Sequence, residues 1–126
     1  MDAKELLYYG FGQVIYSISL IDGRIQREEV ETMQSILEKA HKENQIEMDV
    51  ASIIFSLQNS ENSFTTKESF EFGIKNMKLG DQYLTKQIFE NFCEILQKIA
   101  DSYPPATNEE RDTIQLFKNQ FKQFYN

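Results

Sequence analysis

The sequence predicts an all-α fold, namely a single-domain helical bundle of about six helices over residues 1–126. Three observations support this prediction. Apolar residues recur at spacings of three and four residues along most of the chain, which is the period of an amphipathic helix. Glycine, proline or short polar runs separate these segments. The capping-box pattern, in which Glu follows Thr by three residues, starts at Thr65 and again at Thr107.

The first helix is expected over residues 4–21, where one face is apolar. Gly10 and Gly12 lie inside it, and each lowers helix stability by about 1 kcal/mol relative to alanine. Their presence therefore predicts a neighbouring helix that crosses close to this backbone. Asp22-Gly23 then ends the helix, because glycine readily adopts the left-handed conformation that is common at helix ends.

The second and third helices are expected over residues 26–42 and after Asp49. In the second helix, Glu28 and Glu29 lie in the first turn, where the helix dipole favours negative charge. In the third, Asp49 supplies an N-cap for a short apolar segment, which ends before the polar run 59–63.

Three further helices are expected in the C-terminal half. The fourth starts at the Thr65 capping box. Alternating apolar residues at 70–74 would also suit a strand, but no other segment offers that strand a partner. The fifth is expected over residues 82–102, where an apolar stripe continues until the prolines 104–105 stop it. The sixth follows the Thr107 capping box.

The two ends of the chain resemble each other. Leu20-Ile21-Asp22 corresponds to Ile99-Ala100-Asp101, and Glu28-Glu29 corresponds to Glu109-Glu110. Each set describes a corner, with an aspartate at the end of one helix and two glutamates in the first turn of the next. The repeat predicts two helical hairpins that flank a short helical middle.

This arrangement resembles the TerB-like domain of tellurite-resistance and related stress proteins. The resemblance rests on Asp-Gly-x-Ile-x-x-Glu-Glu at residues 22–29 and on Ala100-Asp101 with the later Glu-Glu-Arg. It implies an all-helical fold with an internal pseudo-repeat and a divalent-cation site (calcium, magnesium or manganese) at the two corners. Carried across by position, it implicates as metal ligands Asp22, Glu29, Asp101 and Glu110. It also implies a stress-response role, an unidentified protein partner and association with a membrane-bound stress-response complex.

A simpler interpretation gives the same acids structural roles only. Glu29 and Glu110 each occupy the third position of an expected helix, from which a carboxylate can accept a hydrogen bond from the start of its own helix. Asp22 and Asp101 would then be surface turn residues. Helix caps are common and metal sites are few, so the capping interpretation competes directly with the metal site.

Composition favours a binding role over an enzymatic one. The net charge is −7 and the 13 basic residues are scattered, which argues against a nucleic-acid partner. His41 is the only histidine and Cys93 the only cysteine, so clusters of histidine or thiolate ligands are excluded. Together with the resemblance to TerB-like domains, this leads us to expect a non-enzymatic stress-response or binding module with no cofactor beyond the divalent cation that the resemblance implies. The alternative is a protein-interaction adaptor that uses an exposed aromatic or acidic helix face, with purely structural corners.

Two further expectations concern chemistry and location. A metal-assisted hydrolase built on Asp22, Glu29 and Asp101 is conceivable, but no nucleophile or base accompanies those acids. Cys93 is expected to be an inert packing residue. The apolar run 14–21 is too short to span a bilayer and lacks a signal-peptide cleavage site, so a cytoplasmic protein without a transmembrane segment is expected.

Overall fold

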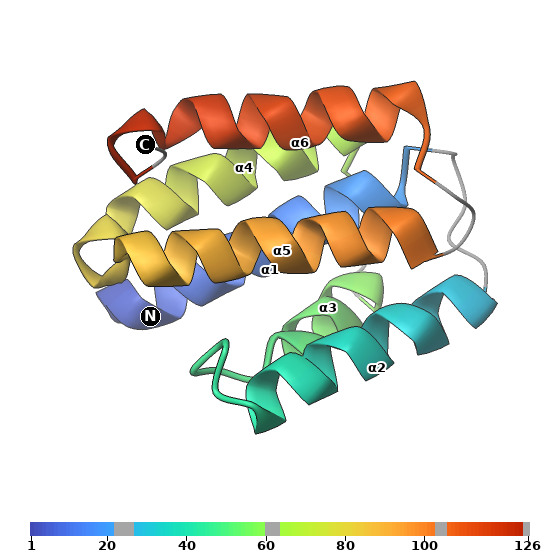
Figure 1. Cartoon of the computed structure of the whole chain (residues 1–126), viewed down its shortest axis with the longest axis horizontal. Helices are drawn as coiled ribbons and strands as arrows, with labels where there is room; N and C mark the ends of the chain where they lie inside the picture. The colour runs from blue at the N-terminus through green and yellow to red at the C-terminus, as the bar shows by residue number, and fades with distance from the viewer. Residues whose placement is uncertain (22–26, 60–63, 103–105, 125–126) are drawn as a thin grey trace.

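The computed structural model describes residues 1–21, 27–59, 64–102 and 106–124, and within them all regular secondary structure is helical (Figure 1). Within these residues the elements follow in the order α1 (Ala3–Ser19), α2 (Arg27–Lys42), α3 (Val50–Gln58), α4 (Thr66–Leu79), the 3₁₀ turn η1 (Asp81–Tyr83), α5 (Lys86–Ser102), α6 (Asn108–Gln120) and the 3₁₀ turn η2 (Lys122–Phe124). The prediction of an all-α bundle is confirmed. Residues 70–74 lie within α4, so a strand there is excluded.

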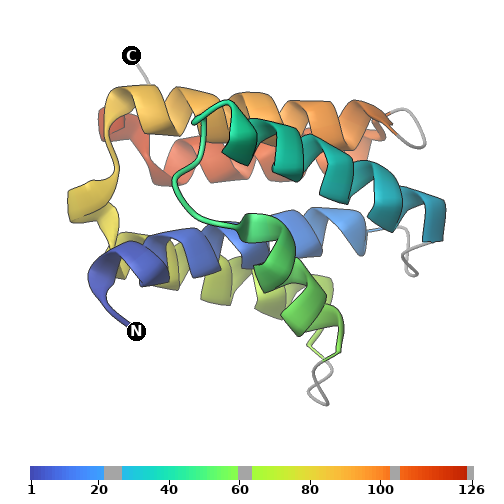
Figure 2. The ribbon, with the colours of Figure 1, turned by 90° about the horizontal axis from the view of Figure 1, so that it is seen from below.

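The helices form two layers, which Figure 2 shows one above the other. One layer holds α1, α3 and α4, and the other holds α2, α5 and α6. In the first layer α1 packs most extensively on α4, and in the second α5 contacts both α2 and α6. Over the described residues α2 packs on α5 and α3 more than on α1. The first expected hairpin is therefore open, because its two helices belong to different layers.

The closest helix contact joins the antiparallel helices α1 and α4, and glycines make it possible. A Cβ atom added to Gly10 would lie 2.5 Å from the carbonyl oxygen of Gly73, and one added to Gly73 would lie 2.8 Å from the carbonyl oxygen of Gly10. Further along, a Cβ on Gly80 would collide with the carbonyl oxygen of Ala3. Gly12 faces side chains of α3, where an added Cβ would lie 2.6 Å from Cγ2 of Ile53. The predicted helix crossings at Gly10 and Gly12 are confirmed.

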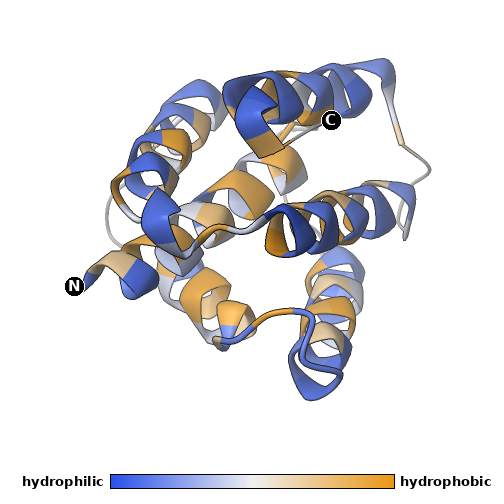
Figure 3. Ribbon diagram, turned by 60° about the vertical axis from the view of Figure 1, so that its left-hand side comes forward, coloured by the Kyte–Doolittle hydropathy of each residue, from blue (hydrophilic) through white to orange (hydrophobic). Residues whose placement is uncertain are grey.

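Aromatic rings fill the core between the two layers. Phe11 of α1 stacks on Phe92 of α5 with ring centroids 3.8 Å apart and an interplanar angle of 6°. Tyr8 meets Phe92 edge-on at 5.5 Å, and Phe89 of α5 reaches Phe117 of α6 at 5.6 Å. All of these side chains are buried, and Figure 3 shows hydrophobic segments turned toward the interior of the bundle. Ring contacts therefore join α5 to both α1 and α6.

The fifth helix starts at Lys86, later than the predicted start at residue 82. Residues Asp81–Tyr83 form a 3₁₀ turn, and Leu84 is extended, with φ −90° and ψ 113°. The Thr85 hydroxyl oxygen then accepts a hydrogen bond of 3.1 Å from the backbone N–H of Ile88, as an N-cap side chain does. The predicted start was wrong because the apolar period does not distinguish a buried extended residue, here Leu84, from a helical one.

Several helix starts are fixed by local caps. Thr65 and Thr107 both form complete capping boxes, as predicted. Asp49 accepts a hydrogen bond from the backbone N–H of Ser52 and caps α3, also as predicted. A further capping box at Asp2 starts α1. The caps at Asp49, Thr65 and Thr107 set the helix starts that line the sites described next.

Candidate functional site

Four helix ends meet at one end of the bundle. The last turns of α1 and α5 lie there with the first turns of α2 and α6 (Figure 1). They enclose a cavity of about 20 Å³ whose lining includes Ser19, Glu29, Ser102 and Glu110. A space of this size holds one water molecule or one ion of similar size. The corner cavity, as we call it, is therefore where the two halves of the sequence repeat come together.

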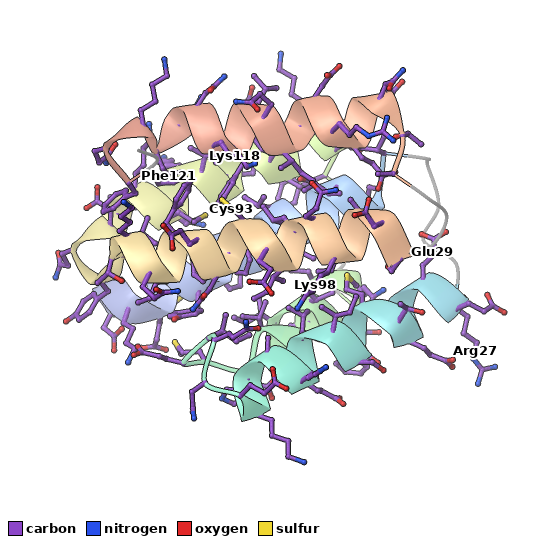
Figure 4. The ribbon with its side chains drawn as sticks, in the orientation of Figure 1. Arg27, Glu29, Cys93, Lys98, Lys118 and Phe121 are labelled. Carbon is purple, nitrogen blue, oxygen red and sulfur yellow. The ribbon has the colours of Figure 1, made fainter. Side chains whose placement is uncertain are left out.

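The structure brings together two of the four predicted metal ligands. Glu29 and Glu110 line the corner cavity, and Figure 4 shows Glu29 on the side of α2 that faces α5. Asp101 instead is exposed, and both of its carboxylate oxygens accept hydrogen bonds of 3.1 Å from Nε2 of Gln97. Asp22 lies outside the described residues. Across the described ranges, no three His, Cys, Asp or Glu side chains are grouped so that they could hold a metal ion.

The electrostatics of the corner cavity combine opposing contributions. The C-terminal turns of α1 and α5 carry partial negative charge, and the N-terminal turns of α2 and α6 carry partial positive charge. Glu110 is 8% exposed, and its Oε1 accepts a hydrogen bond of 3.1 Å from the backbone N–H of Thr107. The predicted capping role of Glu110 is thus confirmed. The hydroxyls of Ser19 and Ser102 donate their hydrogens to carbonyl oxygens of their own helices. The lone pairs of the two hydroxyl oxygens are therefore what these serines can offer to an ion.

A larger groove opens between α4 and α6, and we call it the α4–α6 groove. Its volume is about 430 Å³, which is within the usual range of binding sites. Its apolar lining consists of Ile21, Phe70 and Leu116, and Leu116 is 52% exposed. The two helices run in the same direction (Figure 1), and near their C-terminal ends Nζ of Lys78 donates to Oε1 of Gln120 at 3.3 Å. The groove therefore lies along the N-terminal half of α4 and along α6 from Glu109 to Leu116.

Charged residues accompany this apolar lining. Glu109 and Asp112 of α6 and Lys67 of α4 line the same groove. Nζ of Lys67 lies 4.0 Å from Oε1 of Glu71, an exposed pair one helical turn apart. This groove is not predicted by the sequence. A signal was present, since Glu109, Asp112 and Leu116 follow the helix period on α6, but nothing in the sequence places that face beside α4.

A depression of about 370 Å³ between α2 and α3 brings His41 near Asp49 and Ser52. Ser52 donates both its hydroxyl, at 2.6 Å, and its backbone N–H, at 3.1 Å, to the carboxylate of Asp49. Both hydrogen bonds lower the pKa of Asp49, and the bond from the Ser52 hydroxyl has the larger effect. In a catalytic triad the hydroxyl donates to the imidazole and the imidazole donates to the carboxylate. Here the hydroxyl bonds directly to the carboxylate, which is the geometry of a helix cap.

The thiol of Cys93 lies on α5, close to Lys118 of α6 (Figure 4). Burial raises the pKa of this thiol to about 11, and the positive charge of Lys118 opposes that shift only in part. The thiolate is the reactive form of cysteine, so very little of it is present near neutral pH. The geometry agrees with a packing role for Cys93.

Within the described residues, no helix combines the length and the apolar character needed to cross a membrane. Comparison of the chain with protein-family models, with curated proteins and with solved structures gives no match. The TerB-like resemblance therefore stays a prediction, and the arguments for function rest on the geometry of the corner cavity and of the α4–α6 groove.

Proposed function

We propose that this chain is a non-enzymatic, TerB-like helical module that binds a protein partner in the α4–α6 groove. The observation that supports this most directly is Leu116, which is 52% exposed beside the partly buried Ile21 and Phe70. Burying a leucine side chain is worth about 1.5–3 kcal/mol, so an occupant that covers this lining gains affinity there. Grooves between helices are also a common docking surface for peptide segments.

The test compares two leucines. Leu116 and Leu79 are similarly exposed, at 52% and 57%, but only Leu116 is part of the groove lining. The chain and its Leu116→Gln and Leu79→Gln variants would be tagged and expressed in the native host, and the proteins that co-purify would be quantified. We expect one near-stoichiometric partner that Leu116→Gln loses and Leu79→Gln keeps. Equal recovery of every protein by all three chains would rule out the groove as the docking surface.

A second candidate function is divalent-cation binding in the corner cavity. The meeting of Glu29 and Glu110 in one cavity favours it. A carboxylate has about four lone-pair sites, so Glu110 can keep its capping bond and still contribute an oxygen to an ion. Carboxylate and hydroxyl oxygens are the ligand type of calcium, magnesium and manganese. In this version of the proposal, the ion would connect the module to the stress response that the resemblance implies.

Thermal melting of the chelator-treated protein tests this candidate. A cation that binds only the folded chain raises the melting temperature as its concentration increases. We expect that rise in the wild type and in Glu28→Gln, an exposed acid in the same helical turn, and its loss in Glu29→Gln. Identical melts with and without about millimolar calcium, magnesium or manganese would remove the cation site and leave the groove proposal untouched.

A further inference from the structure

We infer that the occupant of the α4–α6 groove is a cationic amphipathic helix, which places aliphatic side chains on Leu116 and Phe70 and Lys or Arg side chains beside Glu109 and Asp112. This inference rests on the proposed function and specifies its partner. It follows from the backbone chemistry of the groove, from its charge and from the charge of the whole chain.

The backbone chemistry selects a helical occupant. Both walls of the groove are helices, α4 and α6, whose N–H and C=O groups beyond the first turn are hydrogen-bonded within each helix, while Thr65 and Thr107 cap the first turns. An extended peptide covering Phe70 and Leu116 would find no free sheet edge to pair with, and burying its unpaired backbone groups would be costly. A helix satisfies its own backbone, so it can lie in this groove with only its side chains in contact.

The charge of the groove selects a basic face. Two acids on α6, Glu109 and Asp112, line it, against a single lysine, Lys67, which itself lies near Glu71. The N-terminal turns of α4 and α6 carry partial positive charge, but Glu68 and the first-turn acids of α6 already oppose it. The groove therefore presents net negative charge beside its apolar lining, and a basic helix complements both features.

The charge of the whole molecule disfavours a second copy as the occupant. Each chain carries a net charge of −7, so two chains repel at low ionic strength. A second copy would also have to cover Glu109 and Asp112 with a surface that is itself acidic overall. The same long-range field attracts a basic segment and speeds its association.

Synthetic peptides of about fifteen residues test the inference directly. Three peptides share one leucine face, with leucines at helical spacing, and carry Lys, Gln or Glu at the remaining positions. Their affinity for the full chain is measured by fluorescence anisotropy at low and at high salt. We expect the Lys peptide to bind about tenfold more tightly than the Glu peptide at low salt, and this ratio should shrink as salt screens the charges.

Variants show where the Lys peptide binds. Leu116→Gln should weaken it by about tenfold or more, whereas the control Leu79→Gln should not. Glu109→Gln with Asp112→Asn should weaken it by about threefold to tenfold, whereas Glu28→Gln with Glu90→Gln, two exposed acids outside the groove, should have little effect. Circular dichroism would confirm that each variant is folded.

The outcomes separate this inference from the proposed function. If the Glu and Lys peptides bind equally and both depend on Leu116, the cationic partner is wrong and the groove remains a docking surface. If the Lys peptide binds but Leu116→Gln leaves it unchanged, the attraction is non-specific and the inference is wrong. If no peptide binds, the inference is overturned, and the co-purification experiment alone decides the proposed function.

Discussion

Gly10 sets how closely α1 can approach α4, and its replacement should be costly. A Cβ atom at this position would lie 2.5 Å from the carbonyl oxygen of Gly73 and 2.7 Å from the backbone nitrogen of Met77. Backbone cannot move aside locally, so overpacking should cost up to about 3 kcal/mol, and better helix propensity should return about 1 kcal/mol. We expect Gly10→Ala to lower the free energy of unfolding by about 2 kcal/mol in urea titrations.

Gly12→Ala is the matched control for that prediction. Its Cβ would lie 2.6 Å from Cγ2 of Ile53, which is the end of a side chain that can shift. We expect a change in unfolding free energy of less than about 1 kcal/mol. Equal losses for Gly10→Ala and Gly12→Ala would contradict the view that a backbone collision distinguishes the two positions.

Cys93 should react slowly in the folded chain. Its thiol pKa is raised from 9.0 to about 11 by burial, so at pH 8 the folded protein should hold about 100-fold less thiolate than the unfolded chain. We expect iodoacetamide to modify Cys93 about 100-fold faster in urea than in buffer. Similar rates in urea and in buffer would contradict this account.

The raised pKa of Cys93 also makes folding stability depend on pH. Folding stability should fall as pH rises above about 9, because the unfolded chain releases the thiol proton more readily than the folded chain does.

At the residue scale, local spacing predicted much of the core but not its long-range partners. Ile114 and Phe117 follow the helix period of the expected sixth helix and are buried, and Phe89 of α5 is buried as well. Tyr8 is fully buried, and its Oη accepts a hydrogen bond of 3.1 Å from the backbone N–H of Glu47, 39 positions away. Local periodicity contains no information about a partner that distant.

At the element scale, the chain leaves α2 through Asn44, whose backbone is in the left-handed conformation. Its φ is 63°, and the backbone N–H of Gln45 donates to the carbonyl oxygen of Ala40 at 2.8 Å, which is the pattern of a Schellman motif. Asn44→Gly should be neutral or slightly stabilising, because glycine adopts this conformation without strain. Asn44→Val should destabilise the protein by about 1–2 kcal/mol in urea titrations. Equal effects of both substitutions would show that the left-handed conformation does not matter.

Element boundaries were predictable where side chains cap the backbone locally. The starts of α4 and α6 follow from Thr65 and Thr107, because each capping box lies within four consecutive residues. The start of α5 was not predictable from the stripe, since Leu84 is buried outside the helix. The α4–α6 groove was not predictable either. It depends on two helices that run side by side although more than thirty residues separate their starts.

At the scale of the whole molecule, net charge makes its own prediction. A charge of −7 on a chain of 126 residues produces self-repulsion in the compact state, which monovalent salt screens. Raising sodium chloride from about 10 to 150 mM shortens the screening length from about 30 to 8 Å. We expect the free energy of unfolding to rise by up to about 1 kcal/mol. A fall in stability would instead indicate that attractive surface pairs dominate, and the same series is the ionic-strength control for the divalent-cation melts.

The sequence repeat predicted two helical hairpins, and the last turns of α1 and α5 lie together with the first turns of α2 and α6 at one end of the bundle. It could not indicate which acids would line the corner cavity. Asp101 follows Ala100 by one position, yet the helix turn directs it to solvent and to Gln97. The assignment of α1 and α2 to different layers was equally out of reach, since the sequence pattern specifies which face of a helix is apolar and not which helix covers it.

The close contact between α1 and α4 should help to identify this fold in distantly related sequences. A Cβ added to Gly10, Gly73 or Gly80 would meet main-chain atoms of the facing helix, so a smaller neighbouring side chain cannot by itself compensate for a change there. Surface acids, by contrast, can drift without altering the shape of the bundle. We therefore expect glycines at these three positions to be retained for longer than the acidic residues of the corners. Distantly related sequences with this fold would then be identified by these glycines.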